Sequence, residues 1–228
     1  MIIITGASGG IGASILDKLS KHEQIIAVYN SSNTKVKNKK NIKWIKSDLS
    51  SISGVEKVIN EVSKYSDHKI SLLNMCAKKN DNLLVSHDLN LWDESLSLNL
   101  TSPFYFAKLL IPLMIKNKWG RFMFVTSTGG MRGDIGTASY SASKMGLIGL
   151  SKVISKEYAK FNITSNVISL GTFDTGLFQD LTEKKRKEII GSIPSKKVGD
   201  IENIINSVYF IIKSDYVNGS IINIDGGM

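Results

Sequence analysis

The sequence contains a single cysteine, Cys76, and only three histidines and three prolines in 228 residues. A lone cysteine excludes an intrachain disulfide, and with it the small cross-linked scaffolds of secreted proteins, so a cytoplasmic protein is expected. His22, His68 and His87 are too scattered for the spacing of metal ligands, so no metal site is expected. The scarcity of proline and the lack of low-complexity tracts indicate a globular chain.

Long hydrophobic runs are also missing, because no apolar stretch approaches the roughly 20 residues that a membrane-spanning helix needs. Met1 leads directly into Ile2, Ile3 and Ile4 without the charged segment of a signal peptide, so we expect neither a signal peptide nor a membrane partner. A chain of 228 residues can bury one large core. A single domain spanning residues 1–228 is therefore expected.

Acidic residues are in the minority, and the formal net charge is +9. Six lysines lie between residues 35 and 46, and a second basic group lies at residues 184–187. A basic surface attracts polyanions, but the lysines lack interleaved aromatic residues in the manner of a base-stacking platform. No nucleic-acid partner is therefore expected, and solvated surface lysines are the favoured interpretation.

Short apolar runs alternate with amphipathic segments of helical period along the whole chain. This pattern predicts βαβ units and a doubly wound, mostly parallel α/β sheet with helices on both faces. The expected strands are 1–5, 25–29, 42–46, 70–74, 121–126, 163–169 and 220–224, and the expected helices are 10–21, 51–65, 93–117, 139–160 and 200–213. Residues 171–198 break the alternation and are interpreted as a mobile substrate lid.

A glycine-rich turn follows the first expected strand and reads Thr5-Gly6-Ala7-Ser8-Gly9-Gly10-Ile11-Gly12. Glycines let the chain turn sharply and let a pyrophosphate approach the amides at a helix N-terminus. Such a turn alone is compatible with a plain strand-to-helix connection. Its place in the first βα unit favours a dinucleotide site.

The segment after the second expected strand distinguishes the two nicotinamide dinucleotides. An NAD site usually has a carboxylate there for the ribose hydroxyls, but this chain reads Tyr29-Asn30-Ser31-Ser32-Asn33-Thr34-Lys35. Hydroxyl, amide and ammonium groups suit a 2′-phosphate, so NADP(H) is favoured over NAD(H). Asp48, after the third strand, is placed to accept from the adenine amino group, or else belongs to the helix cap region before Ser51.

Tyr140 and Lys144 are four residues apart on an expected helix, so both side chains emerge on one face. A lysine cation beside a phenol favours the phenolate and lowers its pKa toward the range of acid-base catalysis. Ser127 ends a strand at the edge where such sheets bind ligands, and its hydroxyl can donate to a substrate oxygen. Asn99 lies within an expected helix, where an amide is an unusual choice. The alternatives are an exposed helix face for the first pair and a solvent-facing position for Asn99.

Taken together, these residues resemble the short-chain dehydrogenases/reductases, in the single-domain branch that includes 3-oxoacyl-acyl-carrier-protein reductases. The resemblance covers the whole chain and implies a Rossmann-type fold. Its signatures are Thr5-Gly6-x-x-x-Gly10-x-Gly12, Asp48, Asn99, Ser127, Tyr140-x-x-x-Lys144, Asn166, Gly171, Thr175 and the ending Asn218-Gly219 to Asp225-Gly226-Gly227. The chain departs from the family at residues 74–77, which read Asn-Met-Cys-Ala instead of Asn-Asn-Ala-Gly, at Leu170 in place of proline, and at Gly9, where related reductases often have a basic residue.

The resemblance implies that Tyr140 protonates the substrate oxygen, Ser127 polarises the carbonyl and Lys144 binds the nicotinamide ribose. Asn99 would hold a water in the proton relay to Lys144. The cofactor would supply the hydride. The implied cofactor contacts are Gly6, Ser8, Gly10, Ile11, Gly12, Asn30, Ser31, Ser32, Asp48, Leu49, Cys76, Ala77, Tyr140, Lys144, Gly171, Thr172 and Thr175.

The expected lid combines apolar residues with the basic group at 184–187. The apolar residues are Phe173, Leu177, Phe178 and Leu181. This combination suits a 3-oxoacyl thioester delivered on an acidic acyl carrier protein. A small ketone, polyol or keto-sugar is the alternative substrate. A non-catalytic NADP-binding sensor or scaffold is an alternative of another class, against which the intact set of four catalytic residues argues.

The expected helices 93–117 and 139–160 carry more apolar residues than one sheet face could bury. These residues include Phe104, Phe106, Leu109, Leu147 and Leu150. Packing against a twofold partner explains them, and the resemblance implies a homotetramer, with a homodimer as the smaller alternative. The other interpretation places all of them in the intramolecular core.

Overall fold

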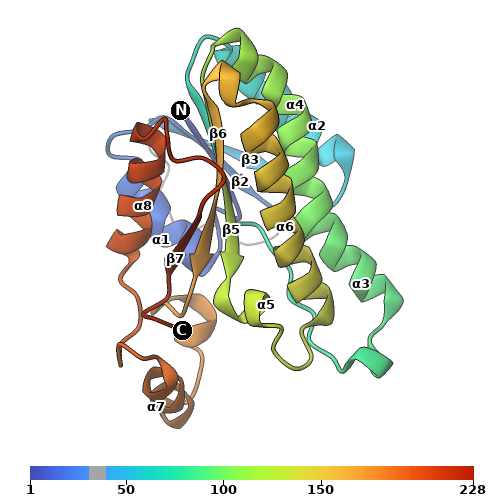
Figure 1. Ribbon diagram of the computed structural model, residues 1–228, viewed down its shortest axis with the longest axis vertical. Coiled ribbons are helices and arrows are strands. Elements are labelled where there is room, and N and C mark those ends of the chain that lie inside the picture. The colour runs from blue at the N-terminus through green and yellow to red at the C-terminus, as the bar shows by residue number, and fades with distance from the viewer. Residues whose placement is uncertain (31–39) are drawn as a thin grey trace.

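The computed structural model describes residues 1–30 and 40–228, and within these ranges one seven-stranded parallel sheet forms the centre of the molecule (Figure 1). The strand order is β3-β2-β1-β4-β5-β6-β7, so the direction of winding reverses between β1 and β4. The strands are β1 (Ile2–Thr5), β2 (Ile25–Tyr29), β3 (Ile42–Lys46), β4 (Ile70–Asn74), β5 (Gly120–Ser127), β6 (Ile163–Leu170) and β7 (Ile221–Ile224). Sheets of this type bind ligands at the carboxyl edge near such a reversal.

Helices cover both faces of the sheet, as the sequence predicts (Figure 1). α1 (Gly10–Leu19) and α8 (Ile201–Lys213) pack on one face, and α2 (Ile52–Val62), α4 (Ser102–Lys116) and α6 (Ala138–Glu157) pack on the other. Successive side chains of a strand point to opposite faces. Ile2 and Ile4 accordingly join the core beneath α1 and α8, while Ile3 joins the other core. The predicted doubly wound α/β fold is confirmed.

One long helical run begins earlier than predicted, at Leu89 instead of residue 93. It comprises α3 (Leu89–Leu96), a π-helical turn over Ser97–Thr101 and α4. The Asp88 side chain caps its start by accepting from the Asn90 amide at 2.7 Å. The π turn inserts one extra residue per turn at the position of Asn99.

The same run, Leu89–Lys116, is long and apolar enough to cross a membrane by length and composition, with a mean hydropathy of 1.3 over its most apolar window. The expectation that no apolar stretch approaches the length of a membrane-spanning helix is therefore wrong for Leu89–Lys116. The core helix of a soluble protein passes the same test, and 44% of this window is buried inside the fold. Residues that include Phe106, Leu110 and Met114 pack against the sheet.

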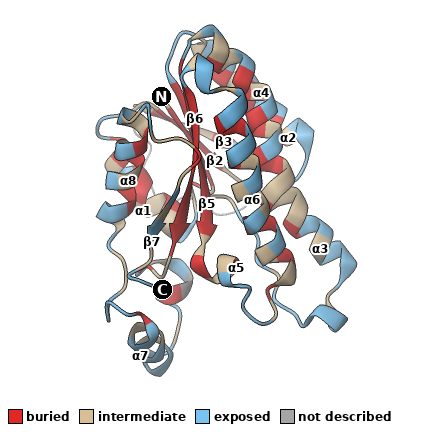
Figure 2. Cartoon of the chain, in the orientation of Figure 1, coloured by how far each residue is buried: buried red, intermediate tan, exposed pale blue. Residues whose placement is uncertain are grey.

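Shorter elements lie between the main ones. α5 (Thr128–Arg132), which the sequence does not predict, follows β5 directly. The turns of 3-10 helix are Ser63–Tyr65, Leu84–Ser86, Ala159–Phe161 and Gly176–Phe178. α7 (Glu183–Ser192) lies inside the expected lid, buries none of its residues and projects from the carboxyl edge of the sheet (Figures 1 and 2).

The expected lid is held to the body at both ends. Gly171 donates its backbone N–H to the carbonyl of Ile224 in β7 at 3.0 Å, and Ser195 donates to the carbonyl of Gly226 at 3.0 Å. Phe173 is 4% exposed and belongs to the core beneath α8. The part of 171–198 that stands away from the sheet is therefore the stretch that contains α7.

The apolar residues expected on the surface of α4 and α6 divide into two groups. Phe106 and Leu147 are fully buried, so assigning them to an exposed face is wrong. Leu109 and Leu150 are half-buried against the core, and Phe104 is 47% exposed. Met145 and Val153, which the sequence reading does not single out, are about equally exposed on α6.

Candidate active site

The glycine-rich turn leaves little room for side chains, as Gly6 and Gly12 show. Gly6 has a φ of +69°, and a Cβ there would lie 3.0 Å from the Cys76 backbone. A Cβ on Gly12 would lie 2.2 Å from the carbonyl oxygen of Gly6. Because only glycine fits, the backbone at the start of α1 stays open for a ligand.

Thr5, at the end of β1, fixes the loop that follows β4. Its hydroxyl donates to Asn74 Oδ1 at 3.1 Å and accepts from the backbone N–H groups of Met75 at 3.0 Å and Cys76 at 3.1 Å. Thr5 and Asn74 are both buried. Sequence reasoning did not give Thr5 this role, although a polar residue that ends an apolar strand is a usable signal.

Two adjoining cavities of about 380 and 340 Å³ form one groove along the carboxyl edge, since both are lined by Gly6, Gly9, Met75 and Ala77. The first is also lined by the expected contacts Gly10, Ile11, Gly12, Tyr140, Lys144, Gly171, Thr172 and Thr175. The second is also lined by the expected contacts Ser8, Asn30, Asp48, Leu49 and Cys76. Ser31 and Ser32 lie outside the described residues, as do Asn33 and Lys35.

The groove also has walls that the sequence reading did not assign to a cofactor. They include Met75 and Phe178 in the first cavity and Lys78 and Leu98 in the second. These residues come to the groove from distant parts of the chain, and no local sequence pattern indicates that position. The glycine-rich turn and the two adjoining cavities fit a dinucleotide.

Asp48 lines the second cavity and also shapes the turn before α2. Its carboxylate accepts from the backbone N–H of Ser50 at 3.0 Å and from the Ser50 hydroxyl at 2.8 Å, and these bonds lower the pKa of Asp48. Ser51 is the cap residue of α2. The two alternatives stated for Asp48 are therefore compatible with each other.

Lys144 is the most deeply buried charged group of the groove. It is 2% exposed, and its Nζ donates to the carbonyl of Val125 at 2.8 Å and lies 5.7 Å from the centre of the Tyr140 ring. Burial lowers the pKa of Lys144 to about 8. The alternative of an exposed helix face for Tyr140 and Lys144 is wrong.

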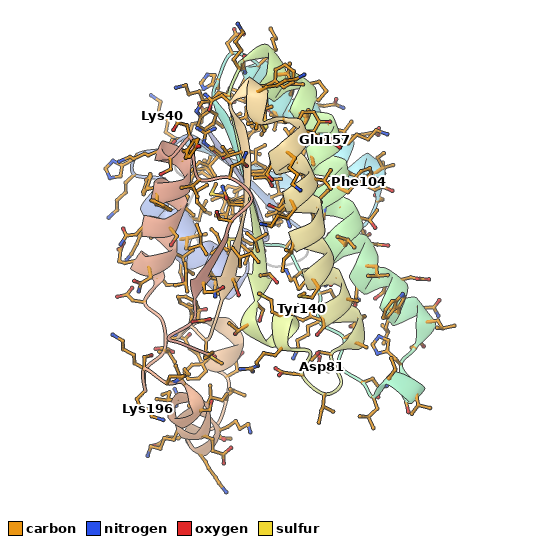
Figure 3. The ribbon with its side chains drawn as sticks, viewed as in Figure 1. Lys40, Asp81, Phe104, Tyr140, Glu157 and Lys196 are labelled. Carbon is orange, nitrogen blue, oxygen red and sulfur yellow. The ribbon has the colours of Figure 1, made fainter. Side chains whose placement is uncertain are left out.

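Tyr140 has a raised pKa, and burial is the main cause. A hydrogen bond with the Ser127 side chain acts in the opposite direction, and the negative charge of Asp81 raises the pKa further. Asp81 and Tyr140 lie at the same end of the molecule (Figure 3). The direction is opposite to the one that the Tyr-Lys pairing predicts, because desolvation of the phenolate is the largest contribution to the pKa of Tyr140.

Asn99 is fully buried in the π turn, so the alternative of a solvent-facing position is wrong. Its Oδ1 accepts from the backbone N–H of Lys78 at 2.8 Å. Its Nδ2 donates to the Lys78 carbonyl at 2.8 Å and to Ser143 Oγ at 3.1 Å. Asn99 thus connects the loop after β4 with the helix that carries Tyr140 and Lys144.

A third cavity, of about 420 Å³, meets the groove at Ser127, Tyr140, Gly171 and Thr172, which line both spaces. Its other lining residues are mainly polar or charged and include Lys79, Thr128, Arg132, Asp134, Thr137, Ile189 and Ser192. Arg132 pairs with Asp134 at 3.3 Å, and Lys79 pairs with Asp81 at 2.7 Å. The phenol and the serine hydroxyl therefore lie where the groove and this cavity join.

The apolar wall expected of the lid is partly present. Phe173 and Phe178 are buried and line the first cavity, and Leu181 is half-buried. The side chain of Leu177 lies outside the described part of the chain. Lys185 and Lys187 on α7 pair with glutamates of the same helix at 3.1 and 2.6 Å, which reduces the charge of the expected basic rim.

Comparison with known proteins places the sequence among dehydrogenases and reductases. A family model described as short chain dehydrogenase matches residues 1–186. The chain is 33% identical to the 3-oxoacyl-[acyl-carrier-protein] reductase FabG of Buchnera aphidicola subsp. Baizongia pistaciae, over 99% of this chain and 96% of that protein. It is 30% identical to the protein of that name from Aquifex aeolicus and 29% identical to that from Escherichia coli K12, with the same coverage.

Proposed function

The chain belongs to the short chain dehydrogenase family, and on that premise we propose that it is an NADP(H)-dependent reductase of 3-oxoacyl thioesters. At the coarser level it is an oxidoreductase that interconverts a carbonyl and an alcohol with a nicotinamide cofactor. The proposal that this chain reduces a 3-oxoacyl thioester rests on one observation. Tyr140 and Ser127 lie in the walls of both the groove and the third cavity. A carbonyl held there meets two hydroxyl donors.

Tyr140 acts as the general acid. Its raised pKa keeps the phenol protonated at neutral pH, which is the form that a reduction requires. Ser127 donates to the same carbonyl oxygen and polarises it. The bound cofactor supplies the hydride, and the glycine turn, Gly171, Thr172 and Thr175 hold it.

Lys144 and Asn99 assist proton transfer from the Tyr140 phenol. Lys144 carries a positive charge below a pH of about 8 and lies beside the Tyr140 ring, so it offsets the negative charge left when the proton departs. Asn99 holds a water in the relay that returns a proton to the site. Both side chains are buried, which fixes their positions.

NADP(H) is the proposed cofactor because Asn30, an amide instead of a carboxylate, follows β2 and lines the second cavity. Among the described lining residues Asp48 is the acidic one, and it is engaged by Ser50. An amide accommodates a 2′-phosphate that a carboxylate would repel.

A thioester carried on an acyl carrier protein is the proposed substrate. The relatives are named for that activity, and the net charge of +9 favours approach of an acidic carrier. The stretch that contains α7 is proposed as the lid over the third cavity, since Ile189 and Ser192 of that helix line the cavity. We further propose that Phe104, Met145 and Val153 on α4 and α6 pack against a second copy of the chain in a dimer or tetramer.

A small polar ketone or keto-sugar is the second candidate substrate. The specific observation in its favour is the lining of the third cavity, where Lys79, Arg132 and Asp134 offer charged partners to hydroxyl groups. A long hydrocarbon chain would gain little from these contacts.

The test is the loss of NADPH absorbance with acetoacetyl thioesters and with small polar ketones, for the wild type and for Tyr140→Phe. We expect oxidation of NADPH on the thioester and a fall of about 10²–10⁴-fold in kcat for the variant. Activity on polar ketones alone would favour the second candidate. Tight NADPH binding without turnover of any carbonyl would contradict both.

A further inference from the structure

We propose that Ser143 is a positioning residue of the reaction, which joins Asn99 to the helix that carries Tyr140 and Lys144. This inference rests on the proposed function, because it concerns the residues assigned to proton delivery. Ser143 precedes Lys144 directly and lies one turn after Tyr140 on α6. Its side chain is fully buried, so it reaches neither substrate nor solvent.

The hydrogen bonds of Ser143 run in a fixed direction. Its hydroxyl donates to the backbone carbonyl of Tyr140 at 2.7 Å. A serine has a single hydroxyl proton, so it offers only lone pairs to other neighbours. It therefore accepts from Asn99 Nδ2, which lies 3.1 Å away.

This contact gives the second N–H of the Asn99 amide a partner and leaves one lone pair of Oδ1 for a further donor. One N–H of Nδ2 reaches the Lys78 carbonyl and the other reaches Ser143, while Oδ1 accepts from the Lys78 N–H. The bonds to Lys78 fix the amide to the loop after β4. The hydrogen bond to Ser143 fixes Asn99 and Lys78 against α6, and hence against Tyr140.

Removing the hydroxyl leaves one N–H of Asn99 without a partner in a fully buried place. The amide and the Lys78 backbone are then free to shift relative to Tyr140 and Lys144. For Ser143→Ala we expect kcat to fall about tenfold, less than the loss of a catalytic group, with the KM for NADPH changed by less than about twofold. The solvent deuterium isotope effect on kcat should rise, because proton delivery becomes slower.

Ser151 provides the matched control on the same helix. It is 1% exposed, and its hydroxyl lies 2.9 Å from the hydroxyl of Ser165, away from the groove. Ser151→Ala removes an equally buried hydroxyl and should lower Tm to a similar extent, while kcat and the isotope effect stay at the wild-type values. Equal effects of both variants on kcat would reduce Ser143 to a structural residue and overturn the proposal.

A double variant and a hydrogen-exchange measurement test whether Ser143 acts through Asn99. In an Asn99→Ala background, Ser143→Ala should change kcat by less than about twofold, since the serine acts through the asparagine; additive losses would contradict the proposal. Hydrogen exchange at the Lys78 backbone amide needs no turnover and should speed up in Ser143→Ala but not in Ser151→Ala. If the wild type reduces no carbonyl, the proposed function fails, whereas unchanged exchange at Lys78 overturns the role of Ser143 separately.

Discussion

The ammonium group of Lys144 donates a hydrogen bond to the backbone carbonyl of Val125, at 2.8 Å, in the interior of the protein. The partner is a neutral carbonyl, so the charge is solvated by a dipole instead of a carboxylate. Burial of a charge without an opposite charge disfavours the protonated form. The lowered pKa of Lys144, about 8, follows from this arrangement.

Protein stability should consequently depend on pH through Lys144. The folded protein releases this proton near pH 8, whereas the unfolded chain keeps it until about 10.5, the ordinary pKa of a lysine. In that interval the unfolded state binds more protons, so stability rises with pH. Relative to Lys144→Met, the wild type should gain up to about 3 kcal/mol in free energy of unfolding from pH 7 to above pH 10.

Urea unfolding of both proteins at pH 7, 8, 9 and 10 measures this difference. Lys152→Met, which removes an exposed lysine from the same helix, serves as the control and should follow the wild-type pH dependence. Parallel curves for the wild type and Lys144→Met would show that the ammonium group is not desolvated as the structure indicates.

The charge of Asp81 should influence the pH dependence of activity through Tyr140. Burial raises the pKa of Tyr140, and Asp81 raises it further because a negative charge disfavours the phenolate. Asp81→Asn removes that contribution, so the pKa of Tyr140 falls. Reduction needs the protonated phenol, and the decline of kcat/KM at high pH should therefore begin at a lower pH in the variant.

The measurement is the pH profile of kcat/KM for reduction. Asp67→Asn is the control, because Asp67 also pairs with a lysine, Lys116 at 3.7 Å, but is not among the groups that shift Tyr140. A basic limb that stays in place in Asp81→Asn, or moves equally in Asp67→Asn, would show that Asp81 does not act on this limb through Tyr140.

Much of the fold could be predicted from the sequence, since β2, β3 and β4 match the expected strands residue by residue. β2 and β4 are largely apolar runs, and burial on both faces favours that pattern, whereas β3 at the edge of the sheet alternates apolar residues with the exposed Lys43 and Lys46. α5 was missed because its sequence, Thr-Gly-Gly-Met-Arg, contains two weak helix formers in five residues. The start at Leu89 was missed because Leu89 is 79% exposed and gives no helical period.

The residues that the structure brings together at the candidate site could be predicted from the sequence, but their electrostatics could not. The environment of Asn99 depends on Lys78 and Ser143, which are 21 and 44 residues away in the chain. The direction of the Tyr140 pKa depends on burial, which a four-residue spacing does not report. Local pattern identifies the groups, and long-range packing determines their protonation.

The glycine turn should tolerate no side chain at Gly12. Gly12→Ala would place a Cβ 2.2 Å from the Gly6 carbonyl oxygen, so the turn must open at a cost of about 1–3 kcal/mol. We expect a lower Tm and NADPH binding weakened at least about tenfold. Gly149→Ala on α6 is the control for NADPH binding, because a Cβ there meets nothing within 4 Å in this chain and lies outside the groove. Its Tm is not compared, since Gly149 lies between Met145 and Val153 on the face proposed to meet a second copy. Unchanged NADPH binding by Gly12→Ala would exclude the turn as the pyrophosphate site.

Asn30 should set the choice between the two dinucleotides. It follows β2 and lines the second cavity, at the place where a carboxylate usually receives the ribose hydroxyls of NAD. Asn30→Asp introduces an acceptor for those hydroxyls and a negative charge that repels a 2′-phosphate, so the ratio of kcat/KM for NADPH to that for NADH should fall at least about tenfold. Asn30→Ala removes the amide without adding charge and should change the ratio less. If both variants keep the wild-type ratio, the determinant of the preference lies elsewhere, and the absence of a carboxylate after β2 carries no information about the cofactor.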